Sequence, residues 1–309
     1  MDVSIIIVNY NTKQLLADCL NSIYEQTNGI EFEVIVSDNG STDGSIEMLK
    51  NDFPQVAFIE NNANLGFGAA NNRGLKIAKG KYIFYLNSDT ILLNNAVKIF
   101  FDYFEENGEK EKLGALGCML VKKDGAAAIS SDSFLGLEEN FCYFLKDKFY
   151  LLFSTYYKAF KHYLFRYKLK EVKKSPVVHQ KGFVDFIIGA DLFLRNDEFA
   201  KFDEHYFMYC EEVDLQYQME KNNLTRKIIE TPKIIHLEGG SSSRKIYEVL
   251  DLASFTKIQT AISKIYFLKK NALFSPLRIF ILRLTMSVVW LNPLIFKQTA
   301  RHIAKLWKI

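Results

Sequence analysis

Short apolar runs alternate with helical patterns through the first 120 residues of the chain. The apolar runs have the length and residue types of buried strands, and the segments between them carry apolar residues at helical spacing. This strand, helix, strand order predicts a mostly parallel sheet covered by helices on both faces. The expected strands are residues 3–8, 32–37, 56–59 and 82–86, and the expected helices are residues 13–25, 45–50 and 67–79.

A cluster of small polar residues follows each of these expected strands. Because parallel sheets bind ligands at the carboxyl ends of their strands, the clusters should meet at one polar rim. Any single cluster is explained as well by a turn or a helix cap, but the repetition at four strand ends favours a ligand site. The clusters are residues 9–11, 38–40, 61–64 and 87–89.

The last cluster lies in the stretch YLNSDTIL, residues 85–92. Its apolar start fits a buried strand, and Asn87, Ser88 and Asp89 put three polar groups where that strand should stop. Such a group of side chains can form a turn or hold a cation. We interpret the stretch as the end of a central strand and not as a turn between two elements.

The sheet is expected to resume at residues 183–194. Three acids that follow, Glu211, Glu212 and Asp214, are expected in the first turn of a helix, where the helix dipole favours negative charge. That position is ordinary for a structural acid, but the same dipole would keep a catalytic base ionised. Residues 233–236 read as one more short strand, which ends at His236.

The net charge of +3 conceals an uneven distribution. Residues 241–309 hold 12 Lys and Arg against 2 Asp and Glu, whereas residues 1–240 hold 27 against 34. A basic tail on an acidic body predicts a polyanionic neighbour, either nucleic acid or an anionic membrane face. In the last expected helix one face carries Lys297, Arg301, Lys305 and Lys308, and another carries Ile303, Leu306 and Trp307. This pattern is typical of a helix in a membrane interface, although packing on the protein or on a second copy would also explain it.

Residues 141–167 contain 12 Phe or Tyr among 27 positions, interleaved with lysines and an arginine. Base stacking on single-stranded nucleic acid, contact with a membrane surface, and a helical hairpin packed on the core are all consistent with this composition.

Several classes of site are excluded by missing motifs. The chain has neither GxGxxG nor GxxxxGK[ST], and its four cysteines form no CxxC pair. The most apolar later stretch, residues 279–296, is interrupted by Arg283, Asn292 and Pro293, so no membrane-spanning helix is expected. The N-terminus lacks the basic region of a signal peptide, which favours a cytoplasmic protein.

Four segments resemble successive signatures of glycosyltransferase family 2, the inverting enzymes of the GT-A fold: SIIIVNYNTKQLLADCLNSI, VSDNGSTDGS, NANLGFGAANNRGLKIAKGKYIFYLNSDTIL and FMYCEEVDL. They are most similar to the bacterial branch that includes rhamnosyltransferases of surface polysaccharide assembly. The resemblance covers about residues 1–120 and 183–240. It implies an α/β protein with a Rossmann-like, mostly parallel sheet flanked by helices, to which an aromatic and basic helical insertion and a C-terminal helical tail are added.

The resemblance also implies domain limits. Residues 1–240 would form the GT-A catalytic domain, with the nucleotide-sugar half in 1–120, the helical insertion in about 125–180 and the acceptor half in 183–240. Residues 241–309 would form basic C-terminal helices.

The resemblance assigns roles to individual residues. Asp89 and His236 would hold a Mg²⁺ or Mn²⁺ ion that bridges the diphosphate, and Glu212 would be the catalytic base, with Glu211 still in contention and Asp214 as a neighbour. Two positions depart from the family pattern, since Asn87 replaces the first acid of the metal motif and Glu212 replaces the usual Asp. The implied nucleotide-sugar contacts are Asn9, Asn11, Asp38, Asn64, Gly66, Asn72, Arg73, Asn87 and Ser88.

The function implied is an inverting, metal-dependent hexosyltransferase. It would move a sugar, with rhamnose as one candidate, from a UDP or dTDP donor to a hydroxyl of a lipid-linked saccharide acceptor in bacterial surface polysaccharide synthesis. We expect peripheral contact with the inner face of the cell membrane and no nucleic-acid partner. The rival hypotheses are a nucleotide or nucleic-acid binding module without transfer activity, and a nucleotidyltransferase.

Overall fold

The computed structural model describes residues 1–134, 153, 156–157, 181–237 and 253–309. The described residues divide into two compact units. Of the described residues, one unit contains 1–133, 181–207 and 211–237, and the other contains 134, 153, 156–157, 208–210 and 253–309. Most of the expected aromatic and basic helical insertion lies outside the described residues, so that expectation stays a prediction, as do the domain limits.

The first unit is built on a mixed sheet that has eight strands among its described residues. The strands β1 to β4 run parallel to one another and β6 runs parallel to β11, whereas β10 is antiparallel to both β4 and β6, and β8 is antiparallel to β11. The order across the sheet is β3 (Ala57–Glu60), β2 (Phe32–Asp38), β1 (Val3–Asn9), β4 (Tyr82–Asn87), β10 (Asp191–Arg195), β6 (Leu113–Cys118), β11 (Thr225–Ile229) and β8 (Gly182–Val184).

Helices cover both faces of this sheet, as the sequence predicts. Successive strand residues point to opposite sides. Ile5 and Val34 therefore belong to the core under α1, α2 and α4, and Ile6 and Ile35 to the core under α3 and α7. The helices of the first unit are α1 (Lys13–Gln26), α2 (Ser45–Asp52), α3 (Phe67–Leu75), α4 (Ala96–Asn107), the 3₁₀ turn η1 (Glu198–Ala200) and α7 (Glu211–Lys221).

The main sheet resumes within residues 183–194, as the sequence predicts, but these residues do not form one continuous strand. They are divided among the end of β8, β9 (Phe186–Ile187) and β10. The break has a local cause, because the Gln216 side chain accepts a hydrogen bond from Ile187 N at 2.8 Å and donates one to Ile187 O at 2.7 Å. β9 is thereby held by α7 and pairs with β7 (Ser131–Asp132) outside the main sheet.

Helix α3 ends at Leu75, four residues before the predicted end at Lys79. The Ser4 hydroxyl accepts hydrogen bonds from Lys79 N at 3.1 Å and Gly80 N at 2.8 Å. These contacts draw the chain onto β1 at a point where a Cβ on Gly80 would lie 2.3 Å from Ser4 N. The helix therefore has to stop so that the chain can enter β4.

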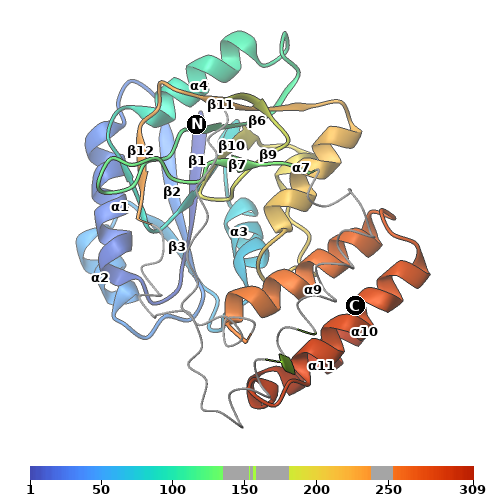
Figure 1. Ribbon diagram of the computed structural model, residues 1–309. Helices are drawn as coiled ribbons and strands as arrows, with labels where there is room; N and C mark the ends of the chain where they lie inside the picture. Colours follow the sequence, from blue (N-terminus) through green and yellow to red (C-terminus); the bar gives the residue numbers. More distant parts are fainter. Residues whose placement is uncertain (135–152, 154–155, 158–180, 238–252) are drawn as a thin grey trace. The chain divides into compact units, whose positions relative to one another are not determined.

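The second unit contains three helices among its described residues: α9 (Phe255–Lys270), α10 (Pro276–Trp290) and α11 (Phe296–Lys308) (Figure 1). Ser254 caps α9 and Ser275 caps α10, each hydroxyl accepting a backbone N–H bond from the first turn. Leu282, Trp290 and Leu306 are buried in this unit. Within the described part of the chain, no helix is both long and apolar enough to cross a membrane.

Candidate active site

The ends of β1 and β2 are joined by Asn9 and Asp38, which face each other in the strand register. Asn9 is fully buried, and its Nδ2 donates to Asp38 Oδ2 at 2.7 Å and to Ser41 Oγ at 3.0 Å. Its Oδ1 accepts from Thr12 Oγ1 at 2.7 Å. Every polar atom of the Asn9 side chain is thus used inside the protein, so Asn9 shapes the rim and positions Asp38.

Asp38 fixes the loop that follows β2. Its Oδ1 accepts from Gly40 N at 3.0 Å and from Ser41 N at 2.8 Å. Asn11 completes this loop, because its Oδ1 accepts from Thr42 N at 2.8 Å and its own N–H donates to Ser41 Oγ at 2.9 Å. The predicted meeting of the first two strand ends is therefore present, and Ser41, which the sequence analysis did not single out, ties them together.

Asp43 holds the start of two helices, a role that the sequence analysis missed. Its carboxylate accepts from Lys13 N of α1 at 2.8 Å, and from Ser45 N at 3.1 Å and Ser45 Oγ at 2.5 Å at the start of α2. Burial acts to raise the pKa of Asp43, but the hydrogen bonds from Ser45 and Lys13 outweigh it and leave the pKa below its ordinary value.

The third polar cluster is joined to the second by Asn39. Asn39 Nδ2 donates to Gly66 O at 3.1 Å and to Asn64 Oδ1 at 3.4 Å, and Asn64 Oδ1 accepts from Gly66 N at 3.0 Å. Gly66 has a φ of 88°, and a Cβ there would lie 2.0 Å from Phe207 O. Only glycine fits this position, so the loop that opens α3 can approach the backbone before α7 closely.

Asn72 and Arg73 lie next to each other on α3 but in different surroundings. Asn72 is buried, donates to Phe202 O at 2.9 Å and Glu204 Oε1 at 3.0 Å, and accepts from Phe202 N at 2.9 Å. Arg73 is exposed in the last turn of the helix. Asn72 therefore holds the 202–204 segment, whereas the predicted contact of Arg73 with the nucleotide sugar stays a prediction.

The fourth cluster is a turn, so our interpretation of YLNSDTIL needs correction. β4 ends at Asn87 as expected, but Ser88 and Asp89 then turn the chain into β5 (Thr90–Leu92). The turn is closed by Thr90 Oγ1, which donates to Asn87 O at 2.7 Å. Ser88 Oγ lies 3.0 Å from Thr12 Oγ1, which connects this turn to the end of β1.

Asp89 and His236 are brought together by a two-stranded sheet. β5 pairs antiparallel with β12 (Ile234–His236), with His236 opposite Thr90, and Leu237 N donates to Asp89 O at 3.0 Å. As a result His236 Nε2 lies 3.4 Å from Asp89 Oδ1, with side chains that are 13% and 20% exposed. The two predicted metal ligands, far apart in the sequence, are neighbours in the fold.

This pair fits a divalent cation. Ligand atoms on an octahedral ion with bonds of about 2.1 Å lie about 3 Å apart, close to the separation found. A carboxylate with an imidazole suits Mn²⁺, whereas Mg²⁺ prefers oxygen alone. Since the described residues contain no group of three or more His, Cys, Asp or Glu side chains that could hold a metal, a cation here would take its other ligands from substrate or water.

The three predicted acids open α7 and differ in accessibility. Glu211 and Asp214 are buried, at 3% and 2% exposed, whereas Glu212 is half-buried. A Cβ on Gly68 of α3 would lie 3.6 Å from Glu211 Cβ, and one on Gly189 would lie 3.7 Å from Glu212 Cβ. Glu211 is therefore packed against α3, and Glu212 faces the loop before β10.

The surroundings of Glu211 and Glu212 raise the pKa of both carboxyl groups. Burial, and after it the charge of Glu212, hold the pKa of Glu211 well above its ordinary value. Burial also raises the pKa of Glu212, against hydrogen bonds from its own backbone and that of Val213. A carboxyl whose pKa is raised towards neutrality is a stronger base once it is ionised.

The chain enters α7 through a strained backbone. Tyr209 and Cys210, the two residues before Glu211, have φ values of 69° and 68°. Non-glycine residues adopt this left-handed conformation at a cost of roughly 1 kcal/mol each, and such strain gathers at functional sites. It fixes the direction in which the first acid of the helix is presented.

Asp191 is a buried acid that the sequence analysis did not select. It is fully buried at the start of β10, and its Oδ2 accepts from Cys118 N at 2.7 Å. Burial raises its pKa from 3.8 to about 7, while the Cys118 hydrogen bonds and the charge of His236 act in the opposite direction. The signal was present in the sequence, because an Asp inside the apolar run FIIGADLFLR must have a partner or a shifted pKa.

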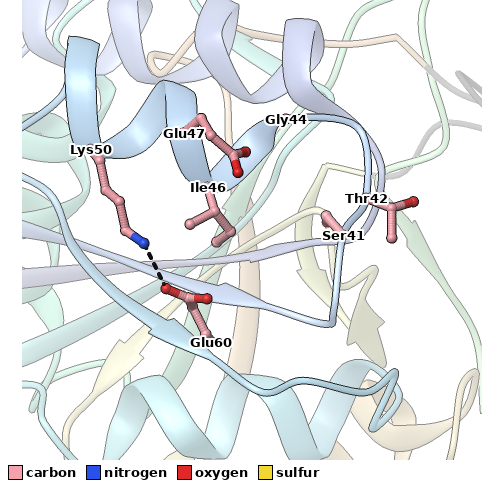
Figure 2. A pocket seen from close by; sticks show the side chains of 7 residues that line it. All are labelled: Ser41, Thr42, Gly44, Ile46, Glu47, Lys50 and Glu60. Carbon is pink, nitrogen blue, oxygen red and sulfur yellow. Dashed lines mark hydrogen bonds and ion pairs between the residues drawn. The ribbon is translucent and has the colours of Figure 1, made fainter.

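A separate pocket of about 420 Å³ lies beside the loop that Asp38 holds (Figure 2). The pocket is open to solvent and lies between α2 and the end of β3. Lys50 and Glu60, which form an ion pair at 3.1 Å, are among the residues that line it. It includes neither the Asp89 and His236 pair nor the acids of α7. Its two glutamates make it unsuited to a diphosphate, so we do not assign the site to it.

The polar rim and Asp89 lie in a part of the chain that matches one family. The family model described as glycosyl transferase family 2 matches residues 4–171, more than half of the chain. The chain belongs to glycosyltransferase family 2. The resemblance inferred from the sequence is thereby confirmed at the level of the family, and the rhamnosyltransferase branch is not.

Curated glycosyltransferases of known activity are similar to a part of the chain. A poly(ribitol-phosphate) β-glucosyltransferase of Bacillus spizizenii is 37% identical over 121 residues, which cover 38% of this chain and 19% of that protein. The UDP-Glc:α-D-GlcNAc-diphosphoundecaprenol β-1,3-glucosyltransferase WfaP of Escherichia coli is 36% identical over 120 residues, which cover 35% of this chain and 47% of that one. The chain thus spans less than half of the length of these relatives.

A solved structure extends the likeness in fold to nearly the whole chain. The mannosyltransferase PcManGT from Pyrobaculum calidifontis, in complex with GDP-Man and Mn²⁺, superposes with a TM-score of 0.53 at 15% identity and covers 99% of this chain and 75% of that one. The expected α/β GT-A fold, with its C-terminal helical region, is confirmed.

Proposed function

We propose that this family 2 chain is an inverting hexosyltransferase that moves a sugar from a nucleoside diphosphate to a hydroxyl of a saccharide acceptor. The observation that carries the proposal is the pairing of Asp89 with His236, 3.4 Å apart, at the rim where four strand ends meet. Residues 1–240 would be the catalytic part and residues 241–309 an added basic part.

Asp89 and His236 would hold a divalent cation, for which we propose Mn²⁺ ahead of Mg²⁺. When bound, the ion supplies positive charge for the leaving diphosphate. The structure of PcManGT with Mn²⁺ and a nucleotide sugar supports this choice. Asn87 is half-buried at the end of β4, and its backbone is used to close the turn that presents Asp89.

Glu212 is our choice for the catalytic base. A base has to reach the acceptor hydroxyl, and Glu212 is the least buried of the three acids at the head of α7. Its carboxylate would take the hydroxyl proton as the oxygen attacks the anomeric carbon opposite the leaving group. Glu211, packed against α3, would help to keep Glu212 in place.

The nucleotide would lie along the loops after β1, β2 and β3, whose shape Asn9, Asp38, Asn11 and Asn64 fix. The donors we propose are UDP- and dTDP-sugars, with rhamnose among the candidate sugars. The two glucosyltransferase relatives named above support testing UDP-glucose first. A lipid-linked acceptor is supported by the activity in the name of WfaP, whose acceptor is α-D-GlcNAc-diphosphoundecaprenol.

Release of nucleoside diphosphate from a panel of nucleotide sugars tests this function. We expect UDP or dTDP release that requires added Mn²⁺ and is lost in Asp89→Ala and in Glu212→Gln. Glu211→Gln should keep a substantial part of the activity. Glu106→Gln, an exposed acid on α4, is the matched control and should behave as the wild type.

The products distinguish the rivals. A nucleotidyltransferase would produce pyrophosphate or nucleoside monophosphate, and a binding module would show a thermal shift with the donor but no turnover. If Glu211→Gln abolished turnover while Glu212→Gln retained it, the base would be Glu211.

A further inference from the structure

The second unit exposes a row of large apolar side chains along α10, which we name the α10 stripe. Leu277, Phe280, Leu284 and Leu291 are 67%, 49%, 48% and 49% exposed. At about 100° per residue these four positions fall within one narrow sector of the helix surface. Single exposed apolar residues are common on proteins, but a continuous stripe indicates a contact surface.

Four cations lie on α11 in a second row, which we name the cationic row: Lys297, Arg301, Lys305 and Lys308. All four are exposed, whereas Thr299, His302 and Leu306 turn inward. The sequence left open whether this helix packs on the protein or presents its cations outward, and it does both. The buried side is occupied within the unit, so the cations remain available to an outside partner.

Trp307 connects the stripe with the row. Its ring meets Phe280 edge to face with centroids 5.6 Å apart, and its Nε1 donates to Ser287 Oγ at 3.0 Å. The ring is nevertheless 39% exposed, and Lys308 follows it directly. Tyr156 adds a second partly exposed aromatic beside α10, since its hydroxyl donates to Val288 O at 3.0 Å. Aromatic rings with a polar edge are typical of membrane interfaces.

The charge of these helices decides between the possible occupants. Residues 253–309 contain 10 Lys and Arg and no Asp or Glu. A second copy of the same surface would bring cations against cations, which disfavours self-association. An anionic bilayer matches both features, because it attracts the cations and accepts the apolar side chains between its headgroups.

We infer that the α10 stripe and the cationic row together form a docking surface for an anionic lipid bilayer. The helices would lie on the membrane without crossing it, in line with their length and composition. The inference gives a named surface to the membrane contact that a lipid-linked acceptor would require, and to that extent it rests on the proposed function.

Vesicle co-sedimentation tests this surface with the full chain. Vesicles of phosphatidylglycerol and phosphatidylcholine in equal amounts should pellet the wild type, and phosphatidylcholine alone should pellet much less of it. High salt should weaken the binding. The double variant Lys297→Gln with Arg301→Gln should lower the partition coefficient about tenfold or more, because each cation near an anionic surface contributes substantially. Phe280→Ser with Leu284→Ser should lower it for the same vesicles by a similar factor.

Matched variants of the first unit serve as controls. Lys110→Gln with Lys201→Gln removes two exposed cations there, and Ile77→Ser removes a 44% exposed apolar residue. Neither should change the partition coefficient. Equal losses in the controls and the test variants, or equal binding to the two kinds of vesicle, would overturn the proposal. If the wild type has the mass of a dimer in solution and Phe280→Ser with Leu284→Ser has the mass of a monomer, the surface binds a second copy of the chain.

Vesicle binding and donor turnover are measured independently, so the membrane proposal and the proposed activity can be rejected separately. The charge variants lie outside the proposed catalytic part, so they should release UDP from a soluble donor at the wild-type rate. Loss of vesicle binding with normal turnover supports the surface, and normal vesicle binding in these variants rejects it whatever the turnover.

Discussion

Asn9 donates a 2.7 Å hydrogen bond to Asp38 from a fully buried position. This one contact joins the ends of two neighbouring strands and leaves Asp38 Oδ1 to hold the following loop through Gly40 N and Ser41 N. The rim that would receive the nucleotide is therefore built from side-chain amides and carboxylates that face inward, and its shape depends on them.

Asn9→Asp should destabilise the protein in a pH-dependent way. The change replaces the donor by a second carboxylate at a buried position, which should cost about 3 kcal/mol or more near neutral pH. A proton shared by the two acids would restore the contact, so their pKa would be raised in the folded state. The missing stability should return as the pH falls and be lost again as it rises. Urea unfolding at several pH values measures this.

The exposed variant Asn62→Asp is the control for Asn9→Asp. Asn62 lies on the surface with a φ of 57°, which Asp also tolerates. It should unfold like the wild type at each pH. A flat pH response in Asn9→Asp would contradict the close pairing of the two side chains.

Gly66→Ala should be far more damaging than Gly125→Ala. The two glycines have similar φ values, 88° and 82°, but a Cβ on Gly66 would lie 2.0 Å from Phe207 O, whereas Gly125 has open space around it. We expect about 1 kcal/mol lost at Gly125 from the backbone alone and about 3 kcal/mol or more at Gly66 from the added clash. Thermal unfolding of the two variants compares them directly, and equal losses would contradict the close approach.

Asp191→Asn should change how stability depends on pH. Burial raises the pKa of Asp191 to about 7, so the folded state binds its proton more tightly than the unfolded chain does. The resulting stability is fully present below about pH 4 and is lost as the pH rises to about 7, with an upper bound of about 4 kcal/mol.

Asparagine keeps an acceptor for Cys118 N but does not titrate. The unfolding free energy of Asp191→Asn, measured without metal ions, should therefore rise relative to that of the wild type between about pH 4 and pH 7. Parallel curves for the two proteins across this window would contradict the shifted pKa.

His236→Gln and Asp89→Asn should each weaken Mn²⁺ binding in the presence of UDP by at least about tenfold, because each replaces a ligand of the proposed pair by an amide, which binds the ion more weakly. Calorimetric titration of Mn²⁺ measures the affinity. His205→Gln changes an exposed histidine, whose ring contacts Asp203, and should leave it unaltered. Unchanged affinity in both test variants would remove the metal assignment.

Local patterns in the sequence predict much of the fold and part of the site. The strands before Asn9, Asp38 and Asn87 are predicted to within one residue of their ends, because buried parallel strands are short apolar runs and their ends are marked by polar residues. The meeting of Asn9 with Asp38 follows from the rule on strand ends in parallel sheets.

Contacts between distant segments are not visible in a local pattern. The sequence predicts a short strand at residues 233–236, but its pairing with β5, which places Asp89 beside His236, is not visible in either segment alone. The partition of residues 183–194 depends on Gln216, a side chain on a later helix. The antiparallel strand β10 and the buried Asp191 at its start depend likewise on neighbours that only the folded chain supplies.

The position of β10 between β4 and β6 has a consequence for shortened chains. The strands of residues 1–120 do not form a closed half of the sheet, because β4 and β6 are neighbours only through a strand made seventy residues later. A fragment that stopped at residue 120 would lack β10 and β11, so one edge of β4 and both edges of β6 would be unpaired, and unpaired edges invite aggregation. A ribosome would have to release residues 191–195 before residues 1–120 could complete their part of the sheet.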